Sequence, residues 1–326
     1  MKKIRVQFVD CDFLKKNFLP FLNERYEVVE TEEPDFAFFN DESKKDCVFH
    51  DCVRILFLGE NNRPDFNLFD YAVGFDDIVF GDRYLQAPLY TWPTYRHPFL
   101  ELALEKEKRD IREKTEFCAF LVSNGNTAST FREKFYDRLS NYKRINSGGL
   151  FRNNMPDGKT VPREEMLEFY AKHKFVMAFE NSKYPSYTTE KIIRAWAGGA
   201  VPIYWGDPKV SEVFNPEAFI EVEGMDEQSV DKAIERIIQL DQNDELYQEM
   251  LLQPIIKDNV KAPSYMNENT IRDFLYHIFD QTPEQASRRT NSKDGWGAYY
   301  EKDMLRYITM DRSSLNHFIY RKIKKL

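Results

Sequence analysis

Short apolar runs alternate with helix-like segments along most of this 326-residue chain, and this alternation limits the folds open to it. Apolar runs of strand length, bounded by polar or turn residues, are typical of buried strands. Strands that alternate with helices build βαβ units and parallel sheets. The first half of the chain contains predicted strands at residues 4–9, 36–39, 53–58 and 71–73. The second half contains predicted strands at 117–122, 175–179, 200–205 and 219–222, with predicted helices at 130–141, 163–173 and 189–197.

A highly charged segment, residues 101–116, separates the two series and is predicted to be a linker or an exposed helix. A chain of 326 residues also exceeds the roughly 250–300 residues at which single cores stop growing. The sequence therefore predicts an α/β protein with two Rossmann-like domains that face a cleft. We place the first domain at residues 1–112 and the second at 113–285, followed by a helical, basic tail at 286–326.

The charge and the cysteine content narrow the classes of function. The formal net charge of -8 argues against sequence-independent nucleic-acid binding, so any site for a phosphorylated ligand must be local. The four cysteines form no CxxC pair and are predicted to be reduced thiols (Cys11, Cys47, Cys52 and Cys118). The first ten residues are too short and too interrupted for a signal peptide, and no apolar window approaches the ~20 residues of a spanning helix. We therefore expect a cytoplasmic location, as for a bacterial cytoplasmic protein.

Residues 313–326 have the pattern of an amphipathic helix. Apolar side chains recur on one predicted face, and basic residues gather at the same end (Leu315, Phe318, Ile319, Ile323 and Leu326; Arg321, Lys322, Lys324 and Lys325). Such a helix can lie on a membrane surface, which predicts peripheral contact with the inner face of the cytoplasmic membrane. The alternative is a helix that packs on the protein with its basic end in solvent. The pattern alone leaves both interpretations open.

The segment from residue 179 to residue 206 carries the clearest chemical signal. It is predicted to form a strand, a polar loop, a helix, a glycine turn and a second strand. The loop leaves the carboxyl end of its strand, where open α/β sheets place ligands, and Thr188 or Thr189 can cap the helix. The first turn holds Glu190 and Lys191. A helix N-terminus with an added lysine suits a pyrophosphate, although Glu190 could merely complement the helix dipole.

The same segment resembles the signature of the α-1,3-fucosyltransferases of glycosyltransferase family 10. The matching residues are Phe179-Glu180-Asn181-Ser182, Tyr187-Thr188-Thr189-Glu190-Lys191 and Ala200-Val201-Pro202-Ile203-Tyr204-Trp205-Gly206. One residue departs from the pattern, since Thr188 stands where valine is usual. Residues 58–76, 120–124 and 148–153 are also similar to Helicobacter-type members. The resemblance implies the glycosyltransferase B fold, a bacterial enzyme and GDP-fucose as the donor substrate.

The resemblance also implies roles for individual residues. Glu60 matches the general base of the family and follows a predicted strand; the alternative is an exposed loop carboxylate paired with Arg63. Arg152 and Lys191 match cations that stabilise the diphosphate leaving group, Arg152 being otherwise a surface arginine. Further donor contacts are implied for a set of mostly polar residues (Ser123, Asn124, Glu180, Asn181, Tyr187 and Glu190).

The activity implied by the resemblance is an inverting transfer of fucose from GDP-β-L-fucose to the 3-hydroxyl of N-acetylglucosamine in N-acetyllactosamine-type acceptors, which gives Lewis x products. A different nucleotide-sugar donor, α-1,4 linkage on type 1 chains, and a non-catalytic carbohydrate- or nucleotide-binding protein remain the alternatives. Asp10-Cys11-Asp12 is interpreted as a loop or helix cap, not as a metal site. No metal is expected to be strictly required, although a divalent cation could stimulate the reaction.

Overall fold

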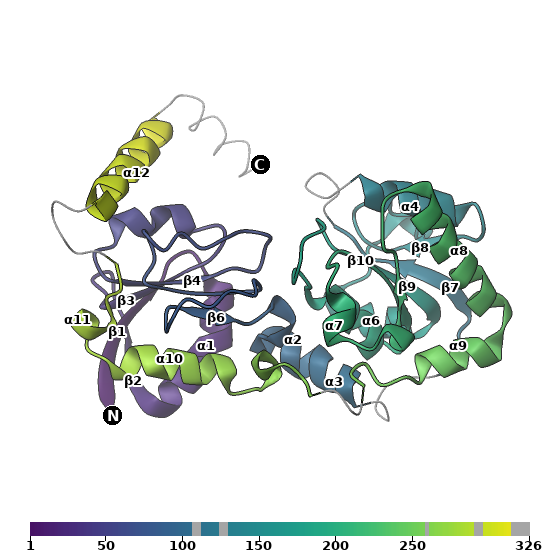
Figure 1. Ribbon diagram of the computed structural model, residues 1–326, viewed down its shortest axis with the longest axis horizontal. Coiled ribbons are helices and arrows are strands. Elements are labelled where there is room, and N and C mark those ends of the chain that lie inside the picture. The colour runs from purple at the N-terminus through teal and green to yellow at the C-terminus, as the bar shows by residue number, and fades with distance from the viewer. Residues whose placement is uncertain (106–111, 124–129, 258–260, 290–295, 314–326) are drawn as a thin grey trace. The chain divides into compact units, whose positions relative to one another are not determined.

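The computed structural model describes residues 1–105, 112–123, 130–257, 261–289 and 296–313. The chain forms two compact units, each an α/β unit with its own sheet (Figure 1). The first unit comprises Met1–Ala87 and Glu268–Leu326, and the second comprises Pro88–Asn267. The helices within the described ranges include none that is both long enough and apolar enough to span a membrane.

The first unit contains a six-stranded sheet with strand order β2-β1-β3-β4-β5-β6, in which all paired strands run parallel. The strands are β1 (Lys2–Phe8), β2 (Tyr26–Glu30), β3 (Phe36–Phe39), β4 (Val53–Phe57), β5 (Tyr71–Gly74) and β6 (Tyr84–Gln86). The helices are α1 (Asp12–Arg25), η1 (Lys44–Phe49), α10 (Thr270–Asp280), α11 (Pro283–Ala286) and α12 (Trp296–Ser313).

Alternate side chains of β3 show how the first sheet buries both faces. Phe38 stacks on Phe8 and also lies near Phe57 and Phe279, with ring centroids 6.1 and 5.9 Å away. Phe279 belongs to α10, which contacts α1 although the two helices are far apart in sequence (Figure 1). Phe39 belongs to a second cluster that includes Ile308 of α12. This period-two pattern is the reason why β3 is apolar throughout.

The second unit contains a five-stranded sheet with strand order β11-β10-β9-β7-β8, again with parallel pairs. Its strands are β7 (Glu116–Phe120), β8 (Ile145–Ser147), β9 (His173–Phe179), β10 (Val201–Trp205) and β11 (Ile220–Glu221). Its α-helices are α2 (Pro93–Tyr95), α3 (Glu101–Leu104), α4 (Phe131–Ser140), α5 (Met166–Ala171), α6 (Glu190–Ala197), α7 (Val210–Val213), α8 (Glu227–Gln242) and α9 (Asp244–Leu251). Shorter helical turns are η2 (Leu89–Thr91), η3 (Arg96–Leu100), η5 (Pro156–Gly158), η6 (Arg163–Glu165), η7 (Pro216–Ala218) and η8 (Ser264–Met266).

The boundaries of the two units differ from those predicted from the sequence. The predicted linker begins inside the second unit, because Phe99, Leu100 and Ala103 are buried in the same apolar cluster as Trp196 of α6. The high charge of residues 101–116 favoured an exposed segment, so the sequence did not reveal these apolar contacts. The predicted second domain also ended too late, because the chain returns to the first unit at Glu268.

The described part of the predicted tail is fastened to the first unit by buried charges. Asp70 is fully buried and accepts hydrogen bonds from the backbone N–H groups of Arg288 and Arg289, at 2.8 and 2.9 Å. Glu301 of α12 pairs with the guanidinium groups of Arg54 and Arg289. Arg288, Arg289 and the described part of α12 therefore belong to the first unit. Residues 314–326, which carry most of the predicted amphipathic pattern, lie outside the described residues.

Candidate active site

The loop that leaves β9 begins with a buried carboxylate. Glu180 has no exposed surface, and its carboxylate accepts hydrogen bonds from the N–H and the hydroxyl of Thr189, both at 2.7 Å. The same carboxylate forms an ion pair with Lys191 at 2.9 Å. Burial raises the pKa of Glu180, and the charge of Lys191 opposes this shift. Glu180 thus ties the end of β9 to the first turn of α6.

Helix α6 begins at the residues that the sequence singled out, but its cap differs from the prediction. Thr189 occupies the N-cap position without a side-chain capping bond, and its hydroxyl donates to Glu180. Lys191 also donates to the Thr189 hydroxyl, at 2.8 Å. The Lys191 side chain is one-quarter exposed, so its ammonium group is oriented by protein contacts and is still accessible from solvent. An oriented lysine at a helix N-terminus can bind a phosphate group.

Glu190 lies beside Lys191 and pairs with Arg194 at 2.9 Å, one helical turn further on. Burial raises the pKa of Glu190, but the charges of Lys191 and Arg194 outweigh it and hold the pKa below its usual value. Arg194 in turn lies over the rings of Tyr95 and Phe99, 5.3 Å from each centroid. Glu190 is therefore held as a carboxylate and can accept hydrogen bonds from sugar hydroxyls.

The glycine turn after α6 confirms the predicted C-cap and brings β10 back beside β9. Gly199 has a φ of 68°, in the left-handed region that glycine adopts readily. Five residue pairs join β10 to β9, from Val201 beside Phe175 to Trp205 beside Phe179. Gly206 then follows directly, and a Cβ atom there would lie 2.4 Å from Cγ of Glu180. Only glycine leaves room for the Glu180 carboxylate at this position.

Two of the predicted donor contacts are largely enclosed by protein. Tyr187 is 1% exposed, and Asn181 is half-buried. Asn181 accepts a hydrogen bond from Arg132 at 3.5 Å. Arg132, on α4, is 2% exposed; burial lowers its pKa, and the nearby Glu180 carboxylate opposes that shift. Sequence reasoning missed Arg132, although a cation within a mostly apolar helical face is a signal that could have identified it.

Arg152 makes a different set of contacts from Lys191 and Arg132. Its guanidinium group pairs with Asp137 and lies over the rings of Tyr136 and Phe151, 5.4 and 5.9 Å from their centroids. Its backbone is left-handed, with a φ of 53°. The loop that carries it starts at Gly149, where a Cβ atom would lie 2.1 Å from the Val122 carbonyl oxygen. The structure therefore keeps Arg152 close to the end of β7, paired with an acidic residue.

The other two predicted donor contacts follow β7. Ser123 is exposed, and Asn124 lies outside the described residues. A small pocket of about 190 Å³ lies at the carboxyl ends of β10 and β11, lined by residues that include Tyr204, Gly206, Asp207 and Glu221. Asp207 is buried there and accepts a hydrogen bond from the N–H of Ser186, in the loop before α6.

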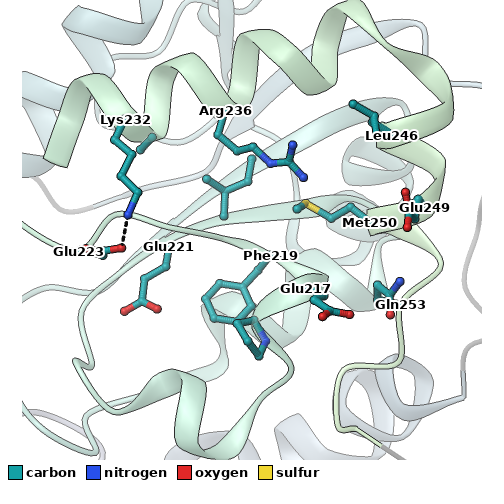
Figure 2. A pocket seen from close by; sticks show the side chains of 13 residues that line it. Glu217, Phe219, Glu221, Glu223, Lys232, Arg236, Leu246, Glu249, Met250 and Gln253 are labelled. Atoms are coloured by element: carbon teal, nitrogen blue, oxygen red, sulfur yellow. Dashed lines mark hydrogen bonds and ion pairs between the residues drawn. The ribbon is translucent and has the colours of Figure 1, made fainter. Parts of the chain in front are cut away.

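A larger pocket of about 430 Å³ lies elsewhere in the second unit (Figure 2). Lys232 and Arg236 of α8, Glu249 and Met250 of α9, and Phe219 line it. None of the eight predicted site residues that the structure describes lines this pocket, so its size does not identify it as the active site.

Glu60 lies in the first unit, after β4, and its side chain is exposed. Asp41, which follows β3, accepts hydrogen bonds from the N–H groups of Gly59 and Glu60, at 2.8 and 3.0 Å. Its other oxygen accepts one from the Asn62 side chain at 2.6 Å. Asp41 therefore fixes the backbone that carries the predicted base. Arg63, the alternative partner proposed for Glu60, forms an ion pair with Asp76 at 3.0 Å.

The Asp10-Cys11-Asp12 motif lies at the start of α1. Asp10 has a φ of 47°, Cys11 occupies the N-cap position, and Asp12 is the first helical residue. The Cys11 thiol contacts the Phe38 carbonyl oxygen at 3.4 Å. Within the described ranges, no group of three or more His, Cys, Asp or Glu side chains is arranged to hold a metal ion.

Known proteins match both units. The model of the α-(1,3)-fucosyltransferase FucT N-terminal domain matches residues 5–93, and that of glycosyltransferase family 10 (fucosyltransferase) C-term matches residues 111–252. The α-(1,3)-fucosyltransferase FucT of Helicobacter pylori is 34% identical over 283 residues, which cover 76% of this chain and 58% of that protein. A bovine 3-galactosyl-N-acetylglucosaminide 4-α-L-fucosyltransferase is 35% identical over 120 residues, 35% of this chain and 30% of the relative. The chain thus spans little more than half the length of the first relative and under a third of the second.

Solved structures agree with these sequence matches. A crystal structure of an α1,3-fucosyltransferase superposes with a TM-score of 0.69 at 29% identity, covering 86% of this chain and 91% of the other. Another crystal structure, of an α1,3-fucosyltransferase with GDP-fucose, superposes with a TM-score of 0.68 at 27% identity, covering 89% and 94%. The predicted fold class, two parallel α/β units of the glycosyltransferase B type, is confirmed. From the two family models and these relatives we conclude that the chain belongs to glycosyltransferase family 10, the fucosyltransferase family.

Proposed function

We propose that this protein is an inverting α-1,3-fucosyltransferase that transfers L-fucose from GDP-β-L-fucose to the 3-hydroxyl of N-acetylglucosamine in N-acetyllactosamine-type acceptors. The observation that carries the proposal is the contact set of Glu180, Thr189 and Lys191 at the N-terminus of α6. It holds one ammonium group and one helix terminus ready for a diphosphate. Similarity to a fucosyltransferase solved with GDP-fucose supports the identity of the donor.

The proposed reaction is a single displacement at the anomeric carbon of fucose. Glu60 removes the proton from the acceptor hydroxyl as that oxygen attacks, and the bond between the anomeric carbon and the β-phosphate oxygen breaks. Negative charge then develops on the GDP leaving group. Lys191, Arg132 and the N–H groups at the start of α6 stabilise that charge. The displacement inverts the β-linked donor to an α-linked product, so no covalent nucleophile is needed.

Six further residues contribute to the donor side of the proposed site. Glu190, with its depressed pKa, supplies acceptor oxygens for vicinal ribose hydroxyls, and Asn181 and Tyr187 contact the donor from the same loop. Ser123, Asn124 and Arg152 complete the proposed donor site. The proposal needs no metal cofactor, because protein cations supply the positive charge, and stimulation by a divalent cation is a question for the assay. The alternative is a related transferase that uses a different nucleotide sugar.

The acceptor and the linkage depend on residues outside this loop. The bovine relative that matches part of the chain is named as a 4-α-L-fucosyltransferase of 3-galactosyl acceptors, so α-1,4 transfer to type 1 chains is the alternative linkage.

We also propose a cytoplasmic location, with peripheral membrane contact through residues 313–326, on the basis of their amphipathic and basic pattern.

The test is an assay of purified protein with GDP-fucose and N-acetyllactosamine, with and without EDTA, followed by mass and linkage analysis. We expect a fucosylated trisaccharide linked at the 3-position of glucosamine, formed in the presence of EDTA. A product linked at the 4-position of a type 1 acceptor would replace the linkage assignment. Stabilisation by UDP but not by GDP in a thermal-shift panel would contradict the donor assignment.

A further inference from the structure

Asp207 holds the half of the β9–α6 loop that Glu180 does not reach. Its Oδ1 atom accepts hydrogen bonds from the N–H groups of Ser186 at 2.7 Å and Lys209 at 2.8 Å. Its Oδ2 atom accepts one from the Thr188 hydroxyl at 2.9 Å. The N–H of Asp207 itself donates to the Tyr204 hydroxyl at 3.1 Å. Asp207 therefore joins the end of β10 to the turn at residues 186–188.

These contacts leave Asp207 unsuited to direct chemistry. The residue is 4% exposed, and both carboxylate oxygens already accept hydrogen bonds from the protein. Such burial limits contact with a substrate, and the hydrogen bonds that this carboxylate accepts come from the protein itself. Its role must be exercised through the loop that it holds.

The turn at residues 186–188 needs such support. Ser186 has a φ of 64°, a left-handed conformation that a non-glycine residue adopts at a cost in energy. Its N–H donates to Asp207, and its carbonyl oxygen accepts a hydrogen bond from the N–H of Thr188 at 3.0 Å. The Asp207 carboxylate thus offsets the cost of a conformation that places Tyr187 between two anchored residues.

Thr188 is the one residue in this segment that departs from the family signature, where valine is usual. Its hydroxyl is buried and lies within hydrogen-bond distance of two groups, Asp207 at 2.9 Å and the Tyr204 hydroxyl at 3.3 Å. A valine at this position would offer no donor to Asp207. The Thr188 hydroxyl and the Asp207 carboxylate therefore form a buried hydrogen-bonded pair in this chain.

The two anchors meet at the end of β10. Gly206, next to Asp207 in the chain, lies against the Glu180 side chain, which leaves room for no Cβ atom. Glu180 anchors Thr189 and Lys191, while Asp207 anchors Ser186 and Thr188. The segment that carries Tyr187, Glu190 and Lys191 is thus held from both sides of Gly206.

We propose that Asp207, acting through the hydroxyl of Thr188, is a positioning residue that sets the affinity of this loop for the nucleoside diphosphate donor. The inference rests on the proposed function, since it assigns the donor to this loop. Loss of the anchor would let residues 186–188 move to other conformations, and donor binding would then have to restore the ordered one. The chemical step, which depends on Glu60 in the other unit, would change little.

The experiment measures GDP binding by calorimetry, together with KM for GDP-fucose and kcat, for four variants. Asp207→Ala removes every side-chain contact, and Asp207→Asn keeps an oxygen for the two N–H donors. Thr188→Val removes only the hydroxyl, and the Asp207→Asn, Thr188→Val double variant completes a mutant cycle. The control is Asp226→Ala, because Asp226 likewise accepts hydrogen bonds from backbone N–H and hydroxyl groups, in this case those of Ser229 at 2.9 and 2.8 Å, outside the site.

We expect Asp207→Ala to weaken GDP binding and raise KM for GDP-fucose by about tenfold or more, with kcat within about twofold. Asp207→Asn should lose less GDP affinity than Asp207→Ala. In the double variant, Thr188→Val should add little to the loss that Asp207→Asn causes alone. Asp226→Ala should leave GDP affinity unchanged. Unchanged GDP affinity in folded Asp207→Asn and Thr188→Val would overturn the inference, as would an equal loss in the Asp226 control. Failure of the wild-type protein to bind GDP would instead contradict the proposed function.

Discussion

The loops that follow β4 in the first unit and β9 in the second are built in contrasting ways. The β4 loop presents Glu60 as an exposed carboxylate, and Asp41 holds only the backbone around it. The β9 loop buries its carboxylates and uses them to orient other groups, with Glu180 holding Lys191 and Asp207 holding Thr188. A base must give up and take protons in contact with substrate, whereas a diphosphate site needs charges that are already oriented. Solvent accessibility therefore distinguishes the proposed base, and burial distinguishes the carboxylates of the donor loop.

The largest expected effect is on the chemical step. Glu60→Gln should lower kcat by about 10²- to 10⁴-fold, because a positioned general base contributes on that order. GDP affinity and thermal stability should change little, since the side chain is exposed and lies in the other unit. Steady-state kinetics and calorimetry on the same preparation measure both. A variant with full kcat would remove Glu60 from the mechanism and leave the contrast between the loops unexplained.

The next effect separates two arginines. Arg132→Ala should weaken GDP binding by about 10- to 100-fold, because Arg132 is buried beside Glu180 and Asn181. Arg152→Ala should have a smaller effect, since Arg152 is paired with Asp137 and lies over Tyr136 and Phe151. Arg132→Lys is the control, because it keeps the positive charge but loses the planar guanidinium group that can donate two hydrogen bonds to a phosphate. The reverse order of affinities would favour the role that the sequence resemblance implied for Arg152, a cation that stabilises the diphosphate beside Lys191.

Close packing around Glu180 predicts a cost for adding one methyl group. Gly206→Ala would place Cβ 2.4 Å from Cγ of a buried side chain, so we expect a loss of about 1–3 kcal/mol in unfolding free energy and weaker GDP binding. Gly158→Ala is the control, because Gly158 has open space and a φ of 64°, which makes only the conformational cost of about 1 kcal/mol relevant. Urea unfolding and GDP titration give the two readouts. Equal effects at both glycines would show that packing against Glu180 contributes nothing.

A smaller kinetic effect should follow from freeing the backbone of the β4 loop. Asp41→Ala removes the acceptor for the N–H groups of Gly59 and Glu60, so kcat should fall by about tenfold while KM for GDP-fucose stays the same. Asp41→Asn, which keeps one acceptor oxygen, should lose less. An effect on KM for the donor rather than on kcat would break the assignment of Glu60 and Asp41 to the base side.

The smallest effect is a pH dependence of stability. Because burial raises the pKa of Glu180, the folded state binds its proton more tightly than the unfolded state does. The contribution of this group to stability should therefore fall as pH rises from its usual pKa of 4.5 to the raised value, and stay level above it. Glu180→Gln should abolish that part of the pH dependence. Unfolding free energies of both proteins between pH 4 and pH 7 give the comparison. Parallel curves would contradict the predicted loss of stability with rising pH that we assign to Glu180.

The sequence predicted the central strands and the signature helix because these elements are locally consistent. Residues 36–39 and 53–58 match β3 and β4, and residues 189–197 match α6, which begins at Glu190 and ends at a left-handed glycine. Edge strands such as β2 and β8 were missed, since both are short, contain polar residues and lack an apolar run of strand length. The predicted strand at residues 219–222 is shorter in the structure, where β11 covers Ile220–Glu221. This strand lies at the edge of its sheet and, among the described strands, pairs with β10 only.

The amino-acid sequence was enough to identify the family and the α/β class, and the resemblance to the family marked Glu60, Glu190 and Lys191 as candidates, because its motifs are runs of neighbouring residues. The folded structure was needed to show which distant groups meet these residues. Arg132 lies far from Asn181 in sequence, and Asp207 comes a strand and a helix after Ser186. Parallel strands bring the ends of β7, β9 and β10 to one edge, so contacts across that edge depend on sheet order and not on spacing along the chain.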